Sequence, residues 1–292
     1  RDVAGRYSMI KEKAMNENSF LELFESFEVS TSGYYEWLGR KPGKRQTANQ
    51  ELAEQIQKIH KNSRKTYGSP RITRTLRKQG VKCGKKRVAR IMKENKIKGA
   101  QKAGFRPRTT DSRHDYPISP NRLKLLADIE YLNQVWSSDI TYIPTQEGWL
   151  YLAAFMDMKS RKIKGWCLRD HLRTDLVEDA FLQAVFRDKP TPGLIVHSDR
   201  GCQYASQQFR NLLDQHKVIS SMSGKGNCYD NAAMESFWAT LKTELKINKP
   251  FKTQEEARLA IFDYIECFYN RFRMHSSLGN LSPLDYESKL CA

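Results

Sequence analysis

The spacing of apolar residues changes part-way along the 292-residue chain and divides it into two kinds of structure. Up to about residue 98, apolar side chains recur every three or four positions, which is the period of an amphipathic helix. Two short helices are predicted within residues 17–38. A polar linker at residues 40–49 then precedes a helix with Leu52, Ile56 and Ile59 on one face. The first part of the chain is therefore expected to be helical.

Residues 67–95 predict two further short helices joined by a turn. Ile72 and Leu76 form the apolar face of the first helix, Gly80 ends it, and Val88 begins the apolar face of the second. Two short helices joined by a glycine-containing turn are typical of a helix-turn-helix.

From residue 135 onward, strand patterns alternate with helix patterns. The first three strands follow one another closely and fit an antiparallel meander. The whole order is that of an RNase H-like α/β domain, with a mixed five-stranded sheet and flanking helices, although other mixed sheets fit it too. Strands are predicted at residues 135–144, 148–158, 162–168, 194–199 and 218–223, and helices at 174–186, with Thr174 as cap, and at 206–216.

Residues 230–245 form one more amphipathic helix, which either Asp230 or Asn231 can cap. Its buried face is marked by Met234, Trp238, Leu241 and Leu245. Off that face lie Glu235 and Lys242, seven residues apart and so on nearly the same line of the helix. Such a pair either lies on the solvent-exposed edge of a core helix or forms part of an active site.

The formal net charge of +17 is concentrated in residues 40–124, which hold 26 Lys and Arg against 5 Asp and Glu. This clustering indicates a polyanionic partner, with nucleic acid favoured over an anionic membrane surface or a merely solvated basic face. No apolar run is long enough to span a membrane. The six scattered cysteines have no metal-ligand spacing and favour a reduced, cytoplasmic protein.

Basic side chains expected to face DNA lie on both helices of the helix-turn-helix and in a later loop. A second helix placed in the major groove would bring them to phosphates and base edges. The alternative is a three-helix bundle with a basic exterior. The candidates are Arg71, Arg74, Lys85, Lys86, Arg87, Arg90 and Lys93, together with Lys225 in the loop at residues 224–231.

Two acidic residues occupy strand positions that disfavour a lone charge. Asp139 lies within W-S-S-D-I-T-Y, and Asp199 ends L-I-V-H-S-D. A buried carboxylate is unfavourable unless it is paired or binds a metal, and ligands bind at the carboxyl ends of strands in open α/β sheets. Together with Glu235, which is separated from Asp199 by 35 residues, they could converge on one sheet edge. Three carboxylates suit two Mg²⁺ ions, with Mn²⁺ as a substitute, in phosphoryl transfer.

Each carboxylate also has an ordinary structural interpretation. Asp199 could be a turn residue, Asp139 could pair with a neighbouring cation, and Glu235 could be a first-turn acid favoured by the helix dipole. Other polar residues also have two possible roles. Asp157 is predicted to be a turn residue rather than a support of the site, and His197 either packs in the core or approaches the site. Asn270 is predicted to brace the domain, whereas Arg273 and His275 either brace it or contact DNA.

Four strings in sequence order point to one known family: W-S-S-D-I-T-Y, H-S-D-R-G-C-Q-Y, S-G-K-G-N-C-Y-D-N-A-A-M-E-S-F and Y-N-x-x-R-x-H-S-S-L-G-x-L-S-P. They resemble the DDE transposases of the bacterial insertion-sequence-three family, specifically the OrfB part. The resemblance covers nearly the whole chain, and Y-G-S-P-R-I with K-K-R-V-A-R-I-M resembles the family's helix-turn-helix. It implies a retroviral-integrase-like core with Asp139, Asp199 and Glu235 as the acidic triad and Lys242 as the basic residue that follows it.

The residue patterns and the resemblance together predict an organisation and a set of partners. The expected parts are an N-terminal helical region (1–48), a basic helix-turn-helix domain (49–98), a linker (99–128) and a catalytic core with a C-terminal helical extension (129–292). The expected partners are double-stranded DNA, at terminal inverted repeats and in a target, and at least a second copy of the chain. Because the family's OrfB is often fused to an upstream frame, fusion is one explanation for a first residue other than Met. The competing functions are a nuclease of RNase H type that cuts without joining and a DNA-binding regulator without catalysis.

Overall fold

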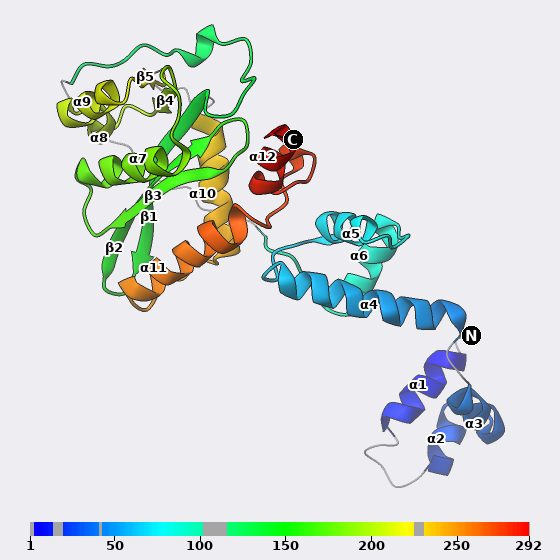
Figure 1. Cartoon of the computed structure of the whole chain (residues 1–292). Coiled ribbons are helices and arrows are strands. Elements are labelled where there is room, and N and C mark those ends of the chain that lie inside the picture. Colours follow the sequence, from blue (N-terminus) through cyan, green and yellow to red (C-terminus); the bar gives the residue numbers. More distant parts are fainter. Residues whose placement is uncertain (1–2, 14–19, 41–42, 102–115, 225–230, 292) are drawn as a thin grey trace.

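The structure is a computed structural model that describes residues 3–13, 20–40, 43–101, 116–224 and 231–291. Along the chain it consists of two small helical groups followed by a larger α/β part (Figure 1). The helices of the two small groups are α1 (Val3–Lys13), α2 (Phe20–Ser26) and α3 (Thr31–Gly39), then α4 (Lys44–Asn62), α5 (Ser69–Lys78) and α6 (Lys85–Glu94).

The N-terminal group has a small core of its own. Tyr7 and Ile10 of α1 pack against Leu23, Phe24 and Tyr34 of the next two helices. The sequence predicted α2 and α3 but not α1, whose apolar residues are too few to form a continuous face. The expected linker is also shorter than predicted, because α4 begins at Lys44 and includes the polar residues up to 49.

The second group is the predicted helix-turn-helix. Leu52, Ile72 and Val88, one from each helix, lie in one apolar cluster. Gly80 follows the end of α5 with a φ of 84°, a left-handed conformation that favours glycine, so it ends the helix as expected. The chain then turns into α6, which brings the two short helices together.

The α/β part contains a five-stranded sheet in the order β3-β2-β1-β4-β5. The first three strands form the predicted antiparallel meander, whereas β4 pairs in parallel with β1 and β5. The strands are β1 (Val135–Thr145), β2 (Gly148–Asp157), β3 (Ile163–Arg169), β4 (Ile195–Ser198) and β5 (Ile219–Met222). The mixed five-stranded sheet of the predicted fold class is therefore confirmed.

Helices cover both faces of the sheet. On one face α7 (Asp175–Asp188), α8 (Cys202–Ala205) and α9 (Gln207–Gln215) pack against Ala153 and Phe155 of β2. A Cβ atom at Gly165 of β3 would clash with the carbonyl oxygen of Ala180, so glycine lets α7 lie directly on the strand. Thr174 precedes α7 as predicted, but its side chain makes no capping hydrogen bond.

On the other face, α10 (Ala232–Glu244) and α11 (Gln254–Phe262) pack against Leu152 and Met156 of β2. A π-helical segment (Asp263–Tyr269) continues α11, and α12 (Pro283–Cys291) closes the described chain. The 3-10 segments are Leu123–Leu125 and Ser276–Leu278. Neighbouring residues of β2 thus point to opposite cores, as strand alternation requires.

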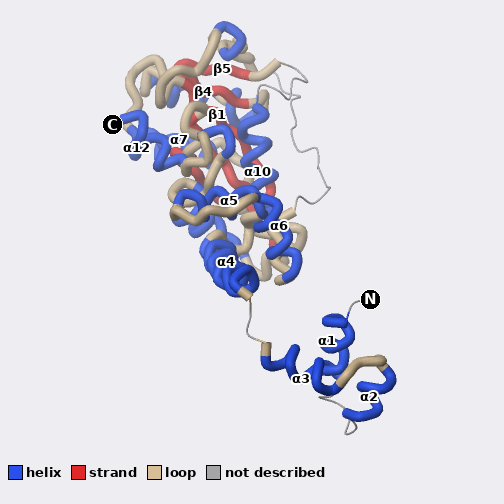
Figure 2. The backbone as a smooth tube through the Cα atoms, turned by 90° about the vertical axis from the view of Figure 1, so that its right-hand side faces the viewer, coloured by secondary structure: helices blue, strands red, loops and turns tan. Residues whose placement is uncertain are grey.

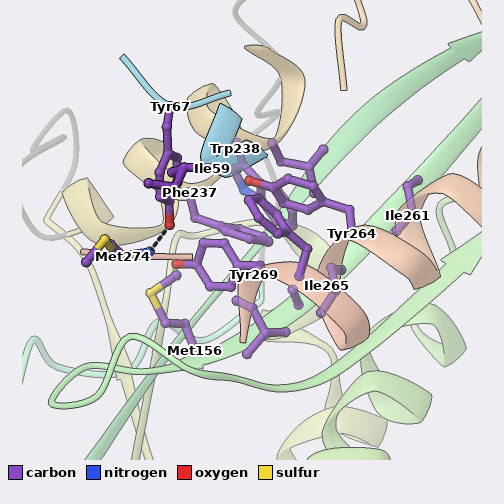
Figure 3. Packing of buried hydrophobic residues seen from close by; sticks show 14 of the residues in the cluster. Ile59, Tyr67, Met156, Phe237, Trp238, Ile261, Tyr264, Ile265, Tyr269 and Met274 are labelled. Carbon is purple, nitrogen blue, oxygen red and sulfur yellow. Dashed lines mark hydrogen bonds between the residues drawn. The ribbon is translucent and has the colours of Figure 1, made fainter. Parts of the chain in front are cut away.

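The helix-turn-helix packs against the α10 side of the α/β part, as both overall views show (Figures 1 and 2). Its apolar cluster is continuous with that of α10 and α11. Tyr67 is at the centre of this contact, because its hydroxyl accepts a hydrogen bond from the backbone N–H of Met274 at 2.8 Å and donates one to the carbonyl of Phe272 at 3.1 Å (Figure 3). The two parts therefore share one core.

Candidate active site

Asp139 lies in the middle of β1, with its side chain half-buried. Both of its carboxylate oxygens accept a hydrogen bond. Oδ1 accepts from the backbone N–H of Ile140 at 2.8 Å, and Oδ2 accepts from the indole N–H of Trp238 at 3.0 Å. The neighbouring Ser138 is fully buried, and its hydroxyl lies 2.8 Å from that of Tyr204. The carboxylate is therefore held in place on a rigid strand.

The pairing of β1 with β4 explains how Asp199 reaches the same place. The parallel register matches Trp136 with Val196 and Ser137 with His197, an offset of 60 residues. Continued by two positions, this register places Asp199, the residue after β4, beside Asp139. Neighbouring strands in a sheet lie about 4.8 Å apart. A hydrogen bond from the backbone N–H of Gly201 at 3.0 Å then holds Oδ1 of Asp199.

Glu235 approaches from α10, whose first turn is attached to β1. Asn231 occupies the N-cap position but does not cap the helix with its side chain, contrary to one of the two capping predictions. Its side-chain oxygen instead accepts a hydrogen bond from the hydroxyl of Ser137 at 2.7 Å. Asp230, the other predicted cap, lies outside the described residues. This contact places Glu235, exposed in the first turn of α10, above the strand that carries Asp139.

The charges of the three carboxylates act on one another. Burial, the Asp199 carboxylate and, more weakly, Glu235 raise the pKa of Asp139 to about 7, against the two hydrogen bonds that lower it. The negative charges of Asp139 and Asp199 also act on the buried phenol of Tyr204. Burial and these two charges raise its pKa well above the ordinary value. Mutual repulsion of this kind is what a bound cation relieves.

The carboxylates fit a hard divalent cation in chemistry, because oxygen ligands of negative charge suit Mg²⁺ or Mn²⁺. Within the described ranges, however, no three His, Cys, Asp or Glu side chains already surround one point at metal-binding distance. The three acidic residues are thus electrostatic neighbours rather than a closed ligand set.

Comparisons with known proteins identify the family of the chain. Residues 131–228 match the model of an integrase core domain, residues 235–290 match a second integrase core model, and residues 47–105 match an HTH-like domain. The chain is 43% identical over 263 residues, 90% of its length, to the uncharacterized 31 kDa protein of insertion element IS600 from Shigella sonnei, of which it covers 96%. It is 38% identical to transposase InsF of insertion sequence IS3A from Escherichia coli (strain K12), over 95% of this chain and 97% of that protein. The chain belongs to the IS3 family of transposases.

Among solved structures, the HTLV-2 integrase catalytic core domain in complex with magnesium is similar over 53% of this chain and 96% of that one, with 16% sequence identity and a TM-score of 0.41. The family membership shows that this chain is a DDE-type transposase with an integrase core preceded by an HTH-like domain. No helix in the described part of the transposase is long and apolar enough to cross a membrane. Its five described cysteines are all free.

Lys242 of the transposase interacts electrostatically with Asp139. Burial lowers the pKa of its ammonium group, and the charge of Asp139 opposes that shift. In the described ranges the Lys242 side chain has no carboxylate within ion-pair distance. It is thus a half-buried cation beside the carboxylates that remains available to an anion.

Trp238 is the residue that the sequence interpretation missed. The sequence placed it only in the buried stripe of α10, yet its indole N–H contacts Asp139 itself. A buried indole N–H needs a hydrogen-bond partner, so a buried Trp three residues after an active-site candidate was the available signal. Tyr204, in the string H-S-D-R-G-C-Q-Y, was also missed, and its hydroxyl contacts that of Ser138, the neighbour of Asp139.

The expected DNA-contacting residues are not equally exposed. Lys85, Lys86, Arg90, Lys93 and Arg74 are exposed on α6 and α5. The Arg87 guanidinium instead donates hydrogen bonds to Asn49 Oδ1 at 2.9 Å and to the Ala48 carbonyl at 3.2 Å, both on α4. Arg71 is ion-paired with Glu244 of α10 at 3.6 Å. Lys225 lies outside the described residues.

The remaining polar candidates mostly brace the fold. Asp157 is fully buried and accepts backbone hydrogen bonds from Asn133, Lys159 and Ser160, which confirms it as a turn residue. Asn270 exchanges two hydrogen bonds with the backbone of Ile163, which confirms its bracing role.

The two residues left undecided, Arg273 and His275, lie in the junction with the helix-turn-helix. Arg273 is ion-paired with Glu244 at 2.9 Å. The ring of His275 stacks edge-on against Tyr269. His197 is fully buried within the sheet, where its Nδ1 lies 2.9 Å from the Ser221 hydroxyl.

Proposed function

We propose that the chain binds the ends of an insertion sequence and catalyses cleavage and transfer of DNA strands at Asp139, Asp199 and Glu235. The observation that supports this proposal is the electrostatic coupling of Asp139 with the other two carboxylates. Asp199 continues a parallel register that places it beside Asp139, and both Asp199 and Glu235 raise the pKa of Asp139.

Asp139, Asp199 and Glu235 would together hold two Mg²⁺ ions, for which Mn²⁺ can substitute. When bound, such ions activate the attacking oxygen and stabilise the leaving oxygen of an in-line displacement. The contribution of the chain is to fix the ligands. β1 and β4 would set the spacing of the two aspartates, and α10 would supply Glu235 from outside the sheet.

The reaction proceeds in two displacements at phosphorus. In the first, water attacks a phosphodiester at the element end, one P–O bond breaks, and a free 3′-hydroxyl is released. In the second, that hydroxyl attacks another phosphodiester, forming a new P–O bond while the displaced strand leaves with its own hydroxyl. No bond between protein and DNA forms. Lys242 would hold a phosphate of the reacting end beside the carboxylates.

The exposed cations of α5 and α6 would bind the terminal inverted repeats. Their contacts with phosphates release counterions, so affinity is expected to fall steeply with salt. Two element ends must be brought together for transposition, which requires at least two copies of the chain. The bacterial cytoplasm, at the nucleoid, is the compartment that this partner implies.

A strand-transfer assay with labelled end DNA and Mg²⁺ tests the proposal. Joined product supports it, cut product without joining indicates a nuclease of RNase H type, and bound but uncut DNA indicates a regulator. Asp139→Asn should abolish cleavage and leave DNA binding largely intact. Asp214→Asn, on the exposed side of α9, is the matched control and should cleave as the parent does. Cleavage retained by Asp139→Asn would reject the assigned site.

A further inference from the structure

Trp238 lies on α10 between Glu235, three residues before it, and Lys242, four residues after it. This spacing keeps the three side chains on neighbouring lines of the helix. All three act on Asp139. Trp238 donates a hydrogen bond to it, whereas Glu235 and Lys242 interact with it through their charges. One helix therefore acts on one carboxylate through a hydrogen bond and two charges.

The hydrogen bond from Trp238 fixes the orientation of the carboxylate. Oδ1 of Asp139 is held by the Ile140 N–H at 2.8 Å and Oδ2 by the indole N–H at 3.0 Å. With one bond to each oxygen, rotation of the carboxylate about its last bond would break both. Each oxygen keeps a further lone-pair direction that can accept a cation.

The indole itself cannot turn away from Asp139. Trp238 is 6% exposed, and its ring packs against that of Phe237 with centroids 4.7 Å apart. It belongs to the apolar cluster shared by α10, α11 and the helix-turn-helix (Figure 3). The packing between α10, α11 and the helix-turn-helix therefore holds the indole N–H in place.

We propose that Trp238 is a positioning residue of the metal site, which orients Asp139 for the cation by hydrogen bonding to Oδ2. The proposal rests on the proposed function, since it takes Asp139 to be a metal ligand. Groups that hold a ligand from behind typically change metal affinity about 10–100-fold when they are removed.

Trp136 provides a matched control on the same strand as Asp139. It is also fully buried, and its indole N–H also donates a hydrogen bond, to Asn133 Oδ1 at 2.9 Å. The two tryptophans therefore lose the same kind of donor on substitution by Phe, but only one of these donors holds a carboxylate of the site.

The test is calorimetric titration of the full chain with Mn²⁺ in the absence of DNA. We expect Trp238→Phe to bind Mn²⁺ about 10–100-fold more weakly than the parent protein. Trp136→Phe should bind within about twofold of it. Replacement of Trp238 by benzothienylalanine, which keeps the bicyclic ring and lacks the N–H, should reproduce the loss and covers the case in which Trp238→Phe does not fold.

A second measurement follows the indole N–H signals of ¹⁵N-tryptophan-labelled protein during titration with Mg²⁺. The Trp238 signal, assigned by its loss in Trp238→Phe, should shift at the same Mg²⁺ concentrations that saturate the site, and the Trp136 signal should not. Unchanged Mn²⁺ affinity in the benzothienylalanine protein would overturn the inference.

Asp139→Asn separates this inference from the proposed function. If Asp139→Asn binds Mn²⁺ as the parent does, the assigned metal site is wrong and the inference falls with it. If Asp139→Asn loses Mn²⁺ binding but the Trp238 variants keep it, only the role of Trp238 is rejected.

Discussion

Arg71 of the helix-turn-helix and Glu244 of α10 are ion-paired across the junction of the two parts, with 3.6 Å between Nη1 and Oε1. Glu244 also accepts hydrogen bonds from Arg273 and from the hydroxyl of Tyr264, both at 2.9 Å, and its side chain is 5% exposed. The first turn of the same helix carries Glu235. One rigid element therefore joins the DNA-binding part to the candidate active site.

Replacement of Glu244 by glutamine should strongly destabilise the fold. The neutral side chain leaves the Arg273 guanidinium, 7% exposed, without its counter-charge, and breaking a buried pair typically costs about 3 kcal/mol. Urea denaturation of Glu244→Gln and of the parent protein measures the difference.

The control for this change is Glu94→Gln on α6. Glu94 is exposed and pairs with Arg90 at 3.5 Å one turn away. Such surface pairs contribute about 0.5 kcal/mol or less. Equal midpoints for the Glu244 and Glu94 variants would mean that the junction pair does not stabilise the protein.

Arg71 and Arg74 lie on the same helix and should differ in what their loss changes. Arg71 faces Glu244, whereas Arg74 is exposed. Arg71→Ala is therefore expected to lower the melting temperature. Arg74→Ala is expected to weaken binding to end DNA and to reduce the slope of log affinity against log salt concentration by about one. Melting curves and binding isotherms at several salt concentrations measure both. If Arg71→Ala reduced the salt slope while Arg74→Ala did not, the two roles would be reversed.

The sequence could predict the elements of the catalytic part because strands and helices there follow simple periods. The alternation in β1 and β2 and the stripe of α10 are direct consequences of packing on one or two faces. The convergence of Asp139 and Asp199 is less direct, since it depends on which strand lies beside β1. That order is a property of the whole sheet, and family resemblance supplied it.

The junction could not be predicted in the same way. Arg71 was interpreted as a DNA contact because its neighbours in the sequence are basic, and nothing local distinguishes a cation that faces phosphate from one that faces Glu244. Their separation of 173 residues leaves no periodic signal. The polar role of Trp238 was hidden for a related reason, because an apolar stripe does not show where an indole N–H points.

The stability of the junction should depend on pH through His275. In an unfolded chain the imidazole titrates near pH 6.5, whereas burial and the charges of Arg273, Arg71 and Arg161 lower its pKa to about 3 in the fold. Between pH 6.5 and 3 the unfolded chain binds a proton that the folded chain does not bind. The free energy of unfolding therefore decreases as the pH falls through this range.

Substitution of His275 by glutamine should remove this contribution. Relative to the variant, the parent protein should lose about 1–2 kcal/mol between pH 7 and pH 5, as measured by urea denaturation at each pH. His216→Gln, at an exposed position after α9, is the control and should follow the parent protein. A parallel pH dependence in His275→Gln and the parent would show that the imidazole does not resist protonation in the fold.

Lys242 offers a prediction about the reacting DNA end that is independent of the metal. Its half-buried ammonium group is influenced by the charge of Asp139 and has no ion-pair partner among the described residues. A phosphate of a bound DNA end would supply the negative charge that pairs with it. Lys242→Ala should weaken binding of end DNA by about 10–150-fold, the equivalent of one hydrogen bond to a charged group, and leave Mn²⁺ affinity unchanged. Lys249→Ala, exposed beyond the end of α10, should change neither quantity. Loss of Mn²⁺ affinity in Lys242→Ala would instead place the lysine in support of the carboxylates, and unchanged affinity for end DNA would remove it from the DNA-binding surface.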